Sequence, residues 1–112
     1  MPKKYNLIFS VAAQNDLKEI FAYISAEYPQ IAEKILDKIE AKANSLVVFP
    51  QKGRIVPELL TYNNIREYRE LQEYPWRIIY QASDGKITVH AVLDGRRNIK
   101  DLLAKKFLHK LP

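Results

Sequence analysis

IREYRELQEYPWRIIYQASDGKITVHAVLDGRR, residues 65–97, carries the clearest structural pattern of this chain. Its side chains alternate with a period of two residues, which is the period of a β-strand. The alternation runs through three segments, which are 65–71, 76–81 and 87–93. Pro75 and the Asp84-Gly85 pair separate these segments and favour tight turns. The stretch therefore predicts three consecutive strands in an antiparallel meander.

The residues before this stretch predict a strand followed by two helices. Residues 5–9 are aromatic and branched, as in a strand, and Ser10 offers an oxygen that can cap a helix. Apolar residues then recur at helical spacing over 11–28, where Pro29 interrupts them, and again over 32–47. Because the connection is short, we expect the two helices to be antiparallel neighbours.

The rest of the chain completes an α+β pattern. Residues 50–64 contain turn-forming residues without a clear period and are predicted to form a loop, whereas an amphipathic pattern from Asn98 onward predicts a final helix. The expected order is β-α-α-β-β-β-α, with a helical hairpin packed on one face of an antiparallel sheet and the other face open apart from the final helix. With 112 residues and 47% apolar content, residues 1–112 are expected to form a single domain.

Positive charge is concentrated in the second half of the chain. Residues 1–50 carry six lysines and six acidic residues, whereas residues 51–112 carry twelve basic and seven acidic residues, which accounts for the net charge of +5. All the arginines lie in this half, and they are Arg54, Arg66, Arg69, Arg77, Arg96 and Arg97. Arginine suits forked contacts with phosphate or carboxylate. We therefore expect an anionic partner, either a nucleic acid or an acidic protein.

The composition excludes several classes of site. The chain has no cysteine, which excludes disulfides, thiolate metal sites and cysteine nucleophiles and is compatible with a reducing cytoplasm. The carboxylates are scattered, so neither a metal nor a cofactor is expected. No apolar run approaches the roughly 18–20 residues that span a bilayer. Since Met1-Pro2-Lys3-Lys4 leads straight into the first predicted strand, we expect an unprocessed cytoplasmic protein without a membrane partner.

The arginines of the meander admit a structural and a functional interpretation. Arg77 either contacts an anion or forms a salt bridge to Glu70 or Glu73 across the hairpin. Arg96 and Arg97 are expected at the start of the last helix, where the helix dipole disfavours cations. That placement does not help stability, so it favours a binding role for both residues.

The predicted last helix carries a wide apolar stripe. Its members are Ile99, Leu102, Leu103, Phe107, Leu108 and Leu111. The stripe either completes the core or forms a docking surface for a partner segment that also places acidic residues against the arginines.

Several short motifs between residues 5 and 103 keep a definite order and spacing. They are Asp16-Leu17-Lys18-Glu19-Ile20 with Tyr23-Ile24, Phe49-Pro50 with Gly53-Arg54, Pro57-Glu58-Leu59, Arg69-Glu70-Leu71, Trp76-Arg77-Ile78-Ile79-Tyr80, and Gly95-Arg96-Arg97. In this order they resemble the RelE/ParE superfamily of toxins from bacterial type II toxin-antitoxin systems. The resemblance implies the same topology and one of two activities: RelE-like members cut mRNA in the ribosomal A site, and ParE-like members poison DNA gyrase.

The residues of a RelE-like nuclease site are matched only in part. RNA cleavage by a 2′-OH needs proton carriers, and cations around the phosphate. Arg77 and Arg97 match the two arginines that stabilise the phosphate in RelE-like nucleases. However, Tyr68 and Glu70 stand where those nucleases have lysines, and Leu103 stands near the position of their tyrosine.

The resemblance therefore implies a ParE-like toxin, a gyrase poison linked to growth inhibition and plasmid stabilization that is neutralised by a cognate antitoxin in a hetero-oligomer. Its binding residues are expected to be Arg54, Arg69, Arg77, Arg96, Arg97, Leu102, Leu103 and Phe107. One alternative is a metal-independent endoribonuclease that cuts mRNA on the ribosome. In that case Arg77 and Arg97 would be catalytic, and the proton carrier would be Tyr68, Tyr80 or His109. The other alternative is a degenerate toxin that serves only as an antitoxin-binding module.

Overall fold

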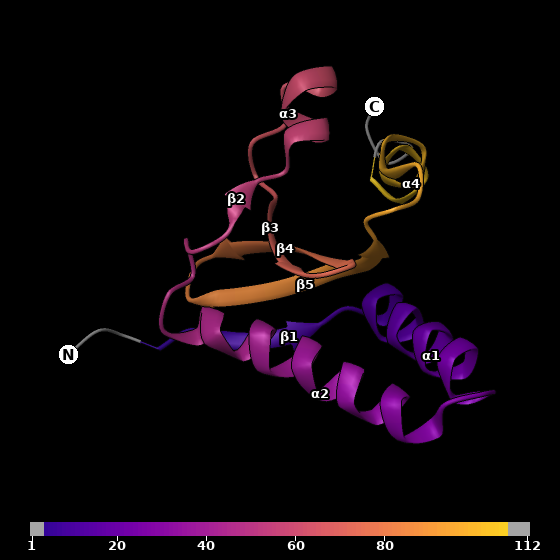
Figure 1. The fold of residues 1–112 in the computed structure, drawn as a ribbon. Helices are drawn as coiled ribbons and strands as arrows, with labels where there is room; N and C mark the ends of the chain where they lie inside the picture. Colours follow the sequence, from indigo (N-terminus) through magenta and orange to yellow (C-terminus); the bar gives the residue numbers. More distant parts are fainter. Residues whose placement is uncertain (1–3, 108–112) are drawn as a thin grey trace.

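The computed structural model describes residues 4–107 of the chain. In chain order the elements are β1 (Asn6–Phe9), α1 (Val11–Ser25), α2 (Pro29–Asn44), the 3-10 helix η1 (Ser45–Val47), β2 (Arg54–Ile55), α3 (Pro57–Asn63), β3 (Arg69–Glu73), β4 (Trp76–Ser83), β5 (Lys86–Asp94) and α4 (Ile99–Lys106). The predicted order is present, and β2, α3 and η1 are added to it. The α+β class is confirmed (Figure 1).

The strands form one mixed sheet in the order β1-β5-β4-β3-β2. The predicted antiparallel meander is confirmed as β3-β4-β5, in which Glu70 pairs with Ile79 and Ile79 pairs with Ala91. β1 joins β5 in parallel, with Leu7 opposite Ile87, so the sheet is not purely antiparallel as predicted. Most of the chain connects β1 to β5, and a connection of that length permits a parallel pairing that a tight turn does not.

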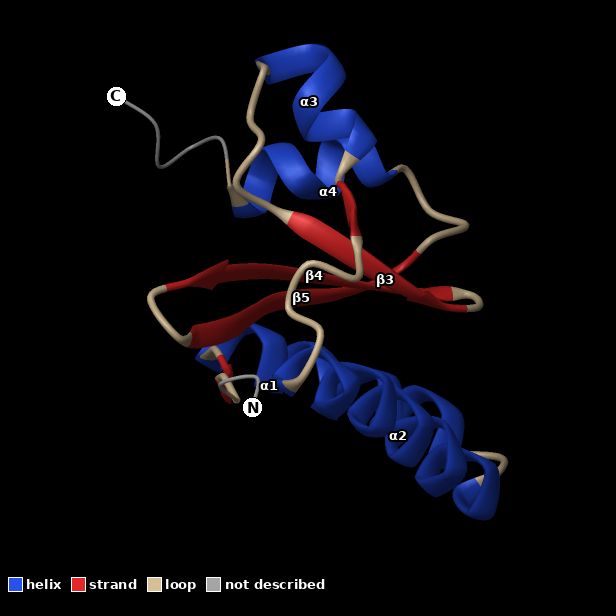
Figure 2. Ribbon diagram, turned by 90° about the vertical axis from the view of Figure 1, so that its left-hand side faces the viewer, coloured by secondary structure: helices blue, strands red, loops and turns tan. Residues whose placement is uncertain are grey.

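The hairpin of α1 and α2 covers one face of the sheet (Figures 1 and 2). Ser10 caps α1, since its Oγ accepts a hydrogen bond from the backbone N–H of Ala13 at 3.1 Å. Pro29 occupies the first position of α2, where its missing N–H would have no partner within the helix. The core between hairpin and sheet includes Ala13, Ile39, Ala43, Leu46, Ile78, Tyr80, Ile87 and Val89.

Helices α3 and α4 cover part of the opposite face, which is therefore less open than predicted (Figure 2). The core on this side consists of Val56, Leu59, Ile79, Ala91, Leu93, Ile99, Leu103 and Phe107. The prediction of a loop over 50–64 was wrong, because this segment contains β2 and α3. Pro57 begins α3, and Asn64 ends it with a left-handed φ of 54°. A helix of seven residues is too short for its apolar stripe to appear as a period.

Two element boundaries differ from the prediction: the end of α1 and the start of β3. Helix α1 ends at Ser25 rather than near residue 28, because Pro29 belongs to the first turn of the next helix. The first meander strand begins at Arg69 rather than at Ile65. Residues 64–68 connect α3 to β3.

The last helix begins where the amphipathic pattern predicted it, but the prediction that Arg96 and Arg97 start this helix was wrong. Asn98 is its N-cap, and Asn98 Oδ1 accepts a hydrogen bond from the backbone N–H of Asp101 at 3.2 Å. Arg96 and Arg97 therefore lie in the turn before α4, outside its first helical turn. The predicted continuation of the apolar stripe to residues 108 and 111 lies outside the described residues.

Candidate functional site

Arg77 is the centre of a buried ion-pair cluster on the sheet face that α3 covers. Its Nη1 and Nη2 each donate to one carboxylate oxygen of Glu58 at 2.7 Å, and its Nε donates to Glu70 Oε2 at 2.9 Å. Nη2 also bonds to Glu70 Oε1. Arg54 adds a contact from Nη2 to Glu70 Oε2 at 3.2 Å. The cluster thus balances two arginines against two carboxylates, with the Glu70 side chain 0% and the Arg77 side chain 9% exposed.

The electrostatics of the cluster favour the charged forms of Glu58 and Arg77. The hydrogen bonds from Arg77 lower the pKa of Glu58, although partial burial opposes this shift. The hydrogen bond to Glu58, followed by the contact with Glu70, raises the pKa of Arg77 against the effect of burial. The salt bridge from Arg77 to Glu70, one of the two predicted partners, is present. Its second partner, Glu58, was missed because it lies in the segment predicted as a loop.

Tyr80 and Arg69 hold the chain between α2 and β2. The buried Tyr80 hydroxyl donates to the carbonyl oxygen of Pro50 and accepts from the backbone N–H of Gly53, both at 2.9 Å. Arg69 Nη1 donates to the Gly53 carbonyl oxygen at 2.8 Å. A Cβ at Gly53 would lie 2.4 Å from the carbonyl oxygen of Glu70, so only glycine fits here. Burial raises the pKa of Tyr80. The proton of its hydroxyl is used in the hydrogen bond to the Pro50 carbonyl oxygen.

In the turn Gly95-Arg96-Arg97, Gly95 packs against the aliphatic part of the Arg77 side chain. The backbone N–H of Gly95 donates to the Pro75 carbonyl oxygen at 2.7 Å, and a Cβ at Gly95 would lie 3.1 Å from Arg77 Cδ. Arg96 forms a forked pair with Asp94, with Nε and Nη2 at 3.0 and 2.8 Å from its carboxylate oxygens. This pairing lowers the pKa of Asp94. Arg97 is exposed.

The predicted docking stripe on α4 divides into core residues and a groove residue. Leu103 and Phe107 are buried, and the Phe107 ring centroid lies 4.7 Å from that of Tyr68. Tyr68 also meets His90 edge-on at 5.4 Å, and burial raises the Tyr68 pKa. Leu102 is half-buried and faces a surface groove. His109 lies outside the described residues.

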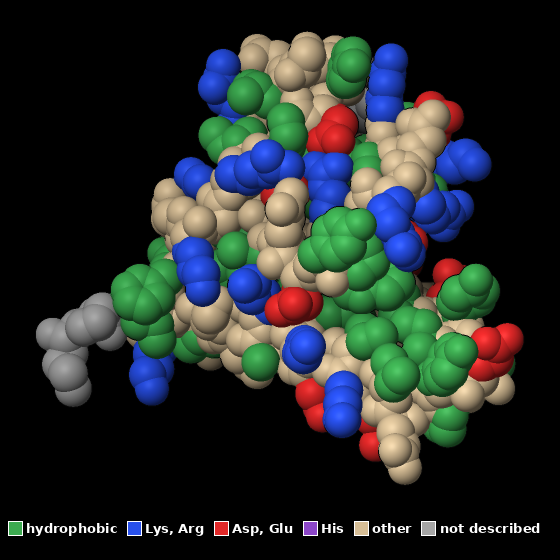
Figure 3. All heavy atoms as spheres, in the orientation of Figure 1, with side chains coloured by type: hydrophobic (Ala, Val, Ile, Leu, Met, Phe, Trp, Pro, Cys, Tyr) green, Lys and Arg blue, Asp and Glu red, His purple; other side chains and the backbone are tan. Residues whose placement is uncertain are grey.

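A groove of about 710 Å³ lies between α1, the end of β5 and α4. Its apolar residues are Ile20, Tyr23, Ile24, Trp76, Val92, Leu93 and Leu102. Its charged residues are Asp16, Glu19, Asp94, Arg96, Arg97 and Lys106. In Figure 3 hydrophobic side chains gather over the α1 side, next to a group of Lys and Arg side chains at α4. Of the predicted binding residues, this groove brings together Arg96, Arg97 and Leu102.

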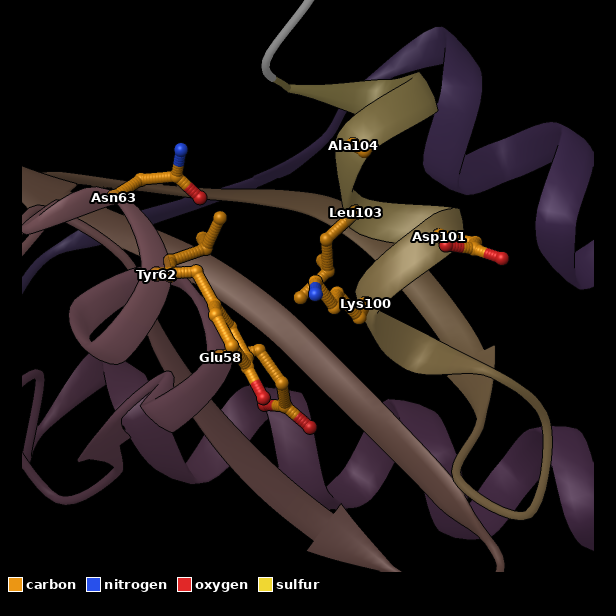
Figure 4. A pocket seen from close by; sticks show the side chains of 8 residues that line it. Glu58, Tyr62, Asn63, Lys100, Asp101, Leu103 and Ala104 are labelled. Carbon is orange, nitrogen blue, oxygen red and sulfur yellow. The ribbon is translucent and has the colours of Figure 1, made fainter.

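A separate cavity of about 340 Å³ lies between α3 and α4. Figure 4 shows Glu58 and Tyr62 of α3 opposite Lys100 and Leu103 of α4. Lys100 Nζ lies 4.2 Å from the centroid of the Tyr62 ring, which places a cation over an aromatic face and links the two helices.

Residues 4–107 contain neither a metal-ligand group nor a helix that could cross a membrane. No three His, Asp or Glu side chains of this range come together as a metal-ligand group. No helix of the same range combines the length and the apolar character that crossing a bilayer requires.

Comparison with known proteins gives a consistent result. The family model described as "ParE toxin of type II toxin-antitoxin system, parDE" matches residues 7–99. Toxin ParE3 of Caulobacter vibrioides is 29% identical over 77 residues, which are 69% of this chain and 72% of that protein. The chromosomal ParDE toxin-antitoxin system of P. aeruginosa superposes with a TM-score of 0.64 at 17% identity and covers 80% of this chain and 95% of that one. The toxin-antitoxin complex RelBE2 of Mycobacterium tuberculosis superposes with a TM-score of 0.56 at 16% identity. The match covers 81% of this chain and 91% of that one. At these identities the structural matches show the fold.

Proposed function

Since this chain belongs to the ParE toxin family of type II toxin-antitoxin systems, we propose that it inhibits growth by binding DNA gyrase. One observation carries the choice of gyrase over RNA cleavage. Arg77, which would have to stabilise a phosphate in a nuclease, donates through Nε, Nη1 and Nη2 to Glu58 and Glu70. A ligand phosphate would have to displace these carboxylates and approach a buried negative charge.

The other residues of a nuclease site support the same choice. Leu103 is buried and has no proton to transfer, and the Tyr80 hydroxyl is held by Pro50 and Gly53. The Tyr68 ring packs against His90 and Phe107. General acid–base catalysis needs a proton carrier within reach of the substrate, and these positions offer none that is both free and exposed.

The proposal includes an antitoxin as the second partner. Two solved structures of this fold are a toxin-antitoxin system and a toxin-antitoxin complex, and the basic second half of this chain suits an acidic protein. We expect the binding to gyrase and the binding to the antitoxin to take place in the cytoplasm, where gyrase acts.

The test uses the purified full chain in two assays. We expect it to inhibit gyrase-catalysed supercoiling of plasmid DNA while an in vitro translation extract remains active. The product of a short reading frame beside this gene, co-expressed with the chain, is expected to co-purify with it and to restore supercoiling. A matched sample with heat-denatured chain controls for impurities.

Two outcomes would contradict the proposal. Arrested translation with cut mRNA and normal supercoiling would instead indicate the RelE-like activity. No effect in either assay, combined with tight binding of the neighbouring product, would indicate a degenerate toxin that only binds antitoxin.

A further inference from the structure

Three basic side chains gather at the sheet edge that β2 forms, and we call Lys52, Arg54 and Arg69 the β2-edge patch. β2 is the last strand at one end of the sheet, so it has β3 on one side and an open edge on the other (Figure 1). Arg69 reaches from β3 to the segment before β2. Its Nη1 donates to the Gly53 carbonyl oxygen at 2.8 Å, and its Nη2 donates to Gln51 Oε1 at 3.2 Å. One short segment and the strand beside it therefore carry all three charges.

The β2-edge patch places positive charge on both faces of this edge. Arg69 is opposite Tyr80 in the strand register, and Tyr80 lies in the core under the helical hairpin. The next residue, Glu70, points to the other face, because side chains alternate along a strand. Arg54 contacts Glu70 and lies with it on the α3 face. A molecule that meets the edge therefore finds a cation on either side of it.

Lys52 and Arg69 are not neutralised by acidic side chains. Lys52 Nζ donates to Ser45 Oγ at 3.1 Å, and both contacts of Arg69 are with uncharged oxygens. Within residues 4–107 neither side chain forms an ion pair. The exposed Arg66 and Glu67 just before β3 carry opposite charges and cancel. The β2-edge patch therefore has an excess of positive charge.

Arg54 can turn to an outside anion at small cost. Its side chain is 57% exposed, and its Nη2 lies 3.2 Å from Glu70 Oε2. Arg77 bonds to the same carboxylate at 2.9 Å. Glu70 therefore keeps a partner when Arg54 leaves it, and no buried charge is left unpaired.

The segment that carries Lys52 and Arg54 is held in place from within. The Tyr80 hydroxyl bonds to the Pro50 carbonyl oxygen and to the Gly53 N–H, both at 2.9 Å. The segment thus has a fixed course next to the sheet. A binding surface that is already ordered loses less conformational freedom when its ligand arrives.

From these observations we propose that the β2-edge patch binds the phosphate backbone of duplex DNA, and that it does so on the DNA that gyrase holds. A duplex carries a row of phosphates on each side of a groove, which matches cations on both faces of a thin edge. A bound protein segment is expected to use an apolar groove, and the patch lies outside both cavities described above. The assignment rests on the proposed function, because gyrase brings the chain to DNA.

The first experiment measures how the full chain binds a short fluorescent duplex, by anisotropy, between about 50 and about 200 mM salt. Contacts with about three phosphates predict a slope of log Kobs against log salt of about −3. We expect Lys52→Gln, Arg54→Gln and Arg69→Gln each to reduce this slope by about 1 and to weaken binding by about threefold to tenfold. Arg69→Lys keeps the charge and should keep the slope.

Two charge-matched controls remove a lysine elsewhere. Lys18→Gln on α1 and Lys34→Gln on α2 change exposed positions and should leave the slope as it is. Phe49→Ala separates DNA from protein as the ligand. Phe49 is 64% exposed, and its carbonyl oxygen accepts from the Lys52 N–H at 3.1 Å. A protein partner would use this ring as an apolar anchor, whereas duplex binding should stay within about twofold. Circular dichroism checks that each variant is folded.

The second experiment places the β2-edge patch on the gyrase complex. Calorimetry compares binding of the chain to gyrase without DNA and to gyrase loaded with duplex. The double variant Lys52→Gln/Arg54→Gln is expected to bind DNA-free gyrase within about twofold of the unmodified chain. On loaded gyrase it should bind about tenfold or more weakly than the unmodified chain, because two phosphate contacts are lost.

The outcomes separate this inference from the proposed function. If the double variant binds duplex as tightly and with the same slope as the controls, the inference is overturned and the proposed function is untouched. The same holds if the double variant loses binding to DNA-free gyrase or to the antitoxin, which would make the patch a protein-binding surface. If the unmodified chain binds duplex but neither binds gyrase nor inhibits supercoiling, the proposed function fails and the patch remains a DNA-binding surface.

Discussion

At the scale of single residues, Arg77 shows how a side chain predicted to bind an anion can be committed to the protein itself. It connects β4 to α3 through Glu58 and to β3 through Glu70. Glu58 and Arg77 are 19 positions apart in sequence, and no local pattern links them. The sequence predicted the Glu70 partner because neighbouring strands bring side chains together at short separation. It could not predict Glu58, whose element was not recognised.

Removing Arg77 is expected to destabilise the fold severely. Arg77→Met leaves the buried Glu70 without its main partner, and breaking a buried ion pair in this way costs about 3–5 kcal/mol in the free energy of unfolding. Arg66→Met, an exposed control, should change it by less than about 0.5 kcal/mol. Urea unfolding followed by circular dichroism measures both. If the double variant Arg77→Met/Glu70→Met is no more stable than Arg77→Met, the buried charge is not the cause.

The lowered pKa of Glu58 predicts a pH dependence of stability. The group binds protons more weakly in the folded chain than in the unfolded chain, so its contribution is present at neutral pH. It is lost as the pH falls below the ordinary glutamate value of 4.5 and through the lower folded pKa. The unmodified chain should therefore lose stability more steeply in acid than Glu58→Gln. Glu40→Gln, at an exposed position of α2, should follow the unmodified chain, and parallel curves for all three would contradict the assignment.

At the scale of elements, the reliable predictions were those made from long, regular patterns. The meander and the helical hairpin have enough residues for a period of 2 or 3.6 to be visible in sequence. β2 and α3 have two and seven residues, and their positions depend on contacts with β3 and α4 instead. The groove could not be predicted for the same reason, because α1, β5 and α4 meet there from distant parts of the chain.

Asp16 joins three of these elements and gives a prediction at this scale. From α1 it accepts a hydrogen bond from the backbone N–H of Val92 in β5 and another from Lys106 Nζ in α4, at 2.9 and 3.0 Å. Asp16→Ala leaves the Val92 N–H unpaired and should cost about 1–3 kcal/mol in the free energy of unfolding. Lys106→Gln removes only the partly exposed ion pair and should cost at most about 1 kcal/mol. Equal losses in thermal or urea unfolding would show that the ion pair dominates.

At the scale of the whole molecule, the helical hairpin covers one face of the sheet, and α3 and α4 cover part of the other face (Figure 2). The cluster around Arg77 is electrically balanced, so it contributes nothing to the net charge of +5. The protein should therefore attract acidic partners over a distance set by the ionic strength.

This net charge predicts how the antitoxin associates. Raising the salt concentration should slow association markedly and change dissociation little, because long-range attraction acts on the encounter. Stopped-flow mixing measures the association rate. Reversing two exposed charges with Arg66→Glu and Lys105→Glu lowers the net charge by four and should flatten the salt dependence. A dependence that stays the same would show that only local contacts matter.

The parallel pairing of β1 with β5 sets the order in which the chain can fold during synthesis. The helical hairpin consists of local contacts and can form early, but β1 finds its partner only when residues 86–89 have been made. A nascent chain that lacks β5 has an unpaired first strand and no completed sheet. The toxin therefore becomes capable of acting only late in its own translation. An antitoxin translated earlier would already be present when the first complete molecules appear.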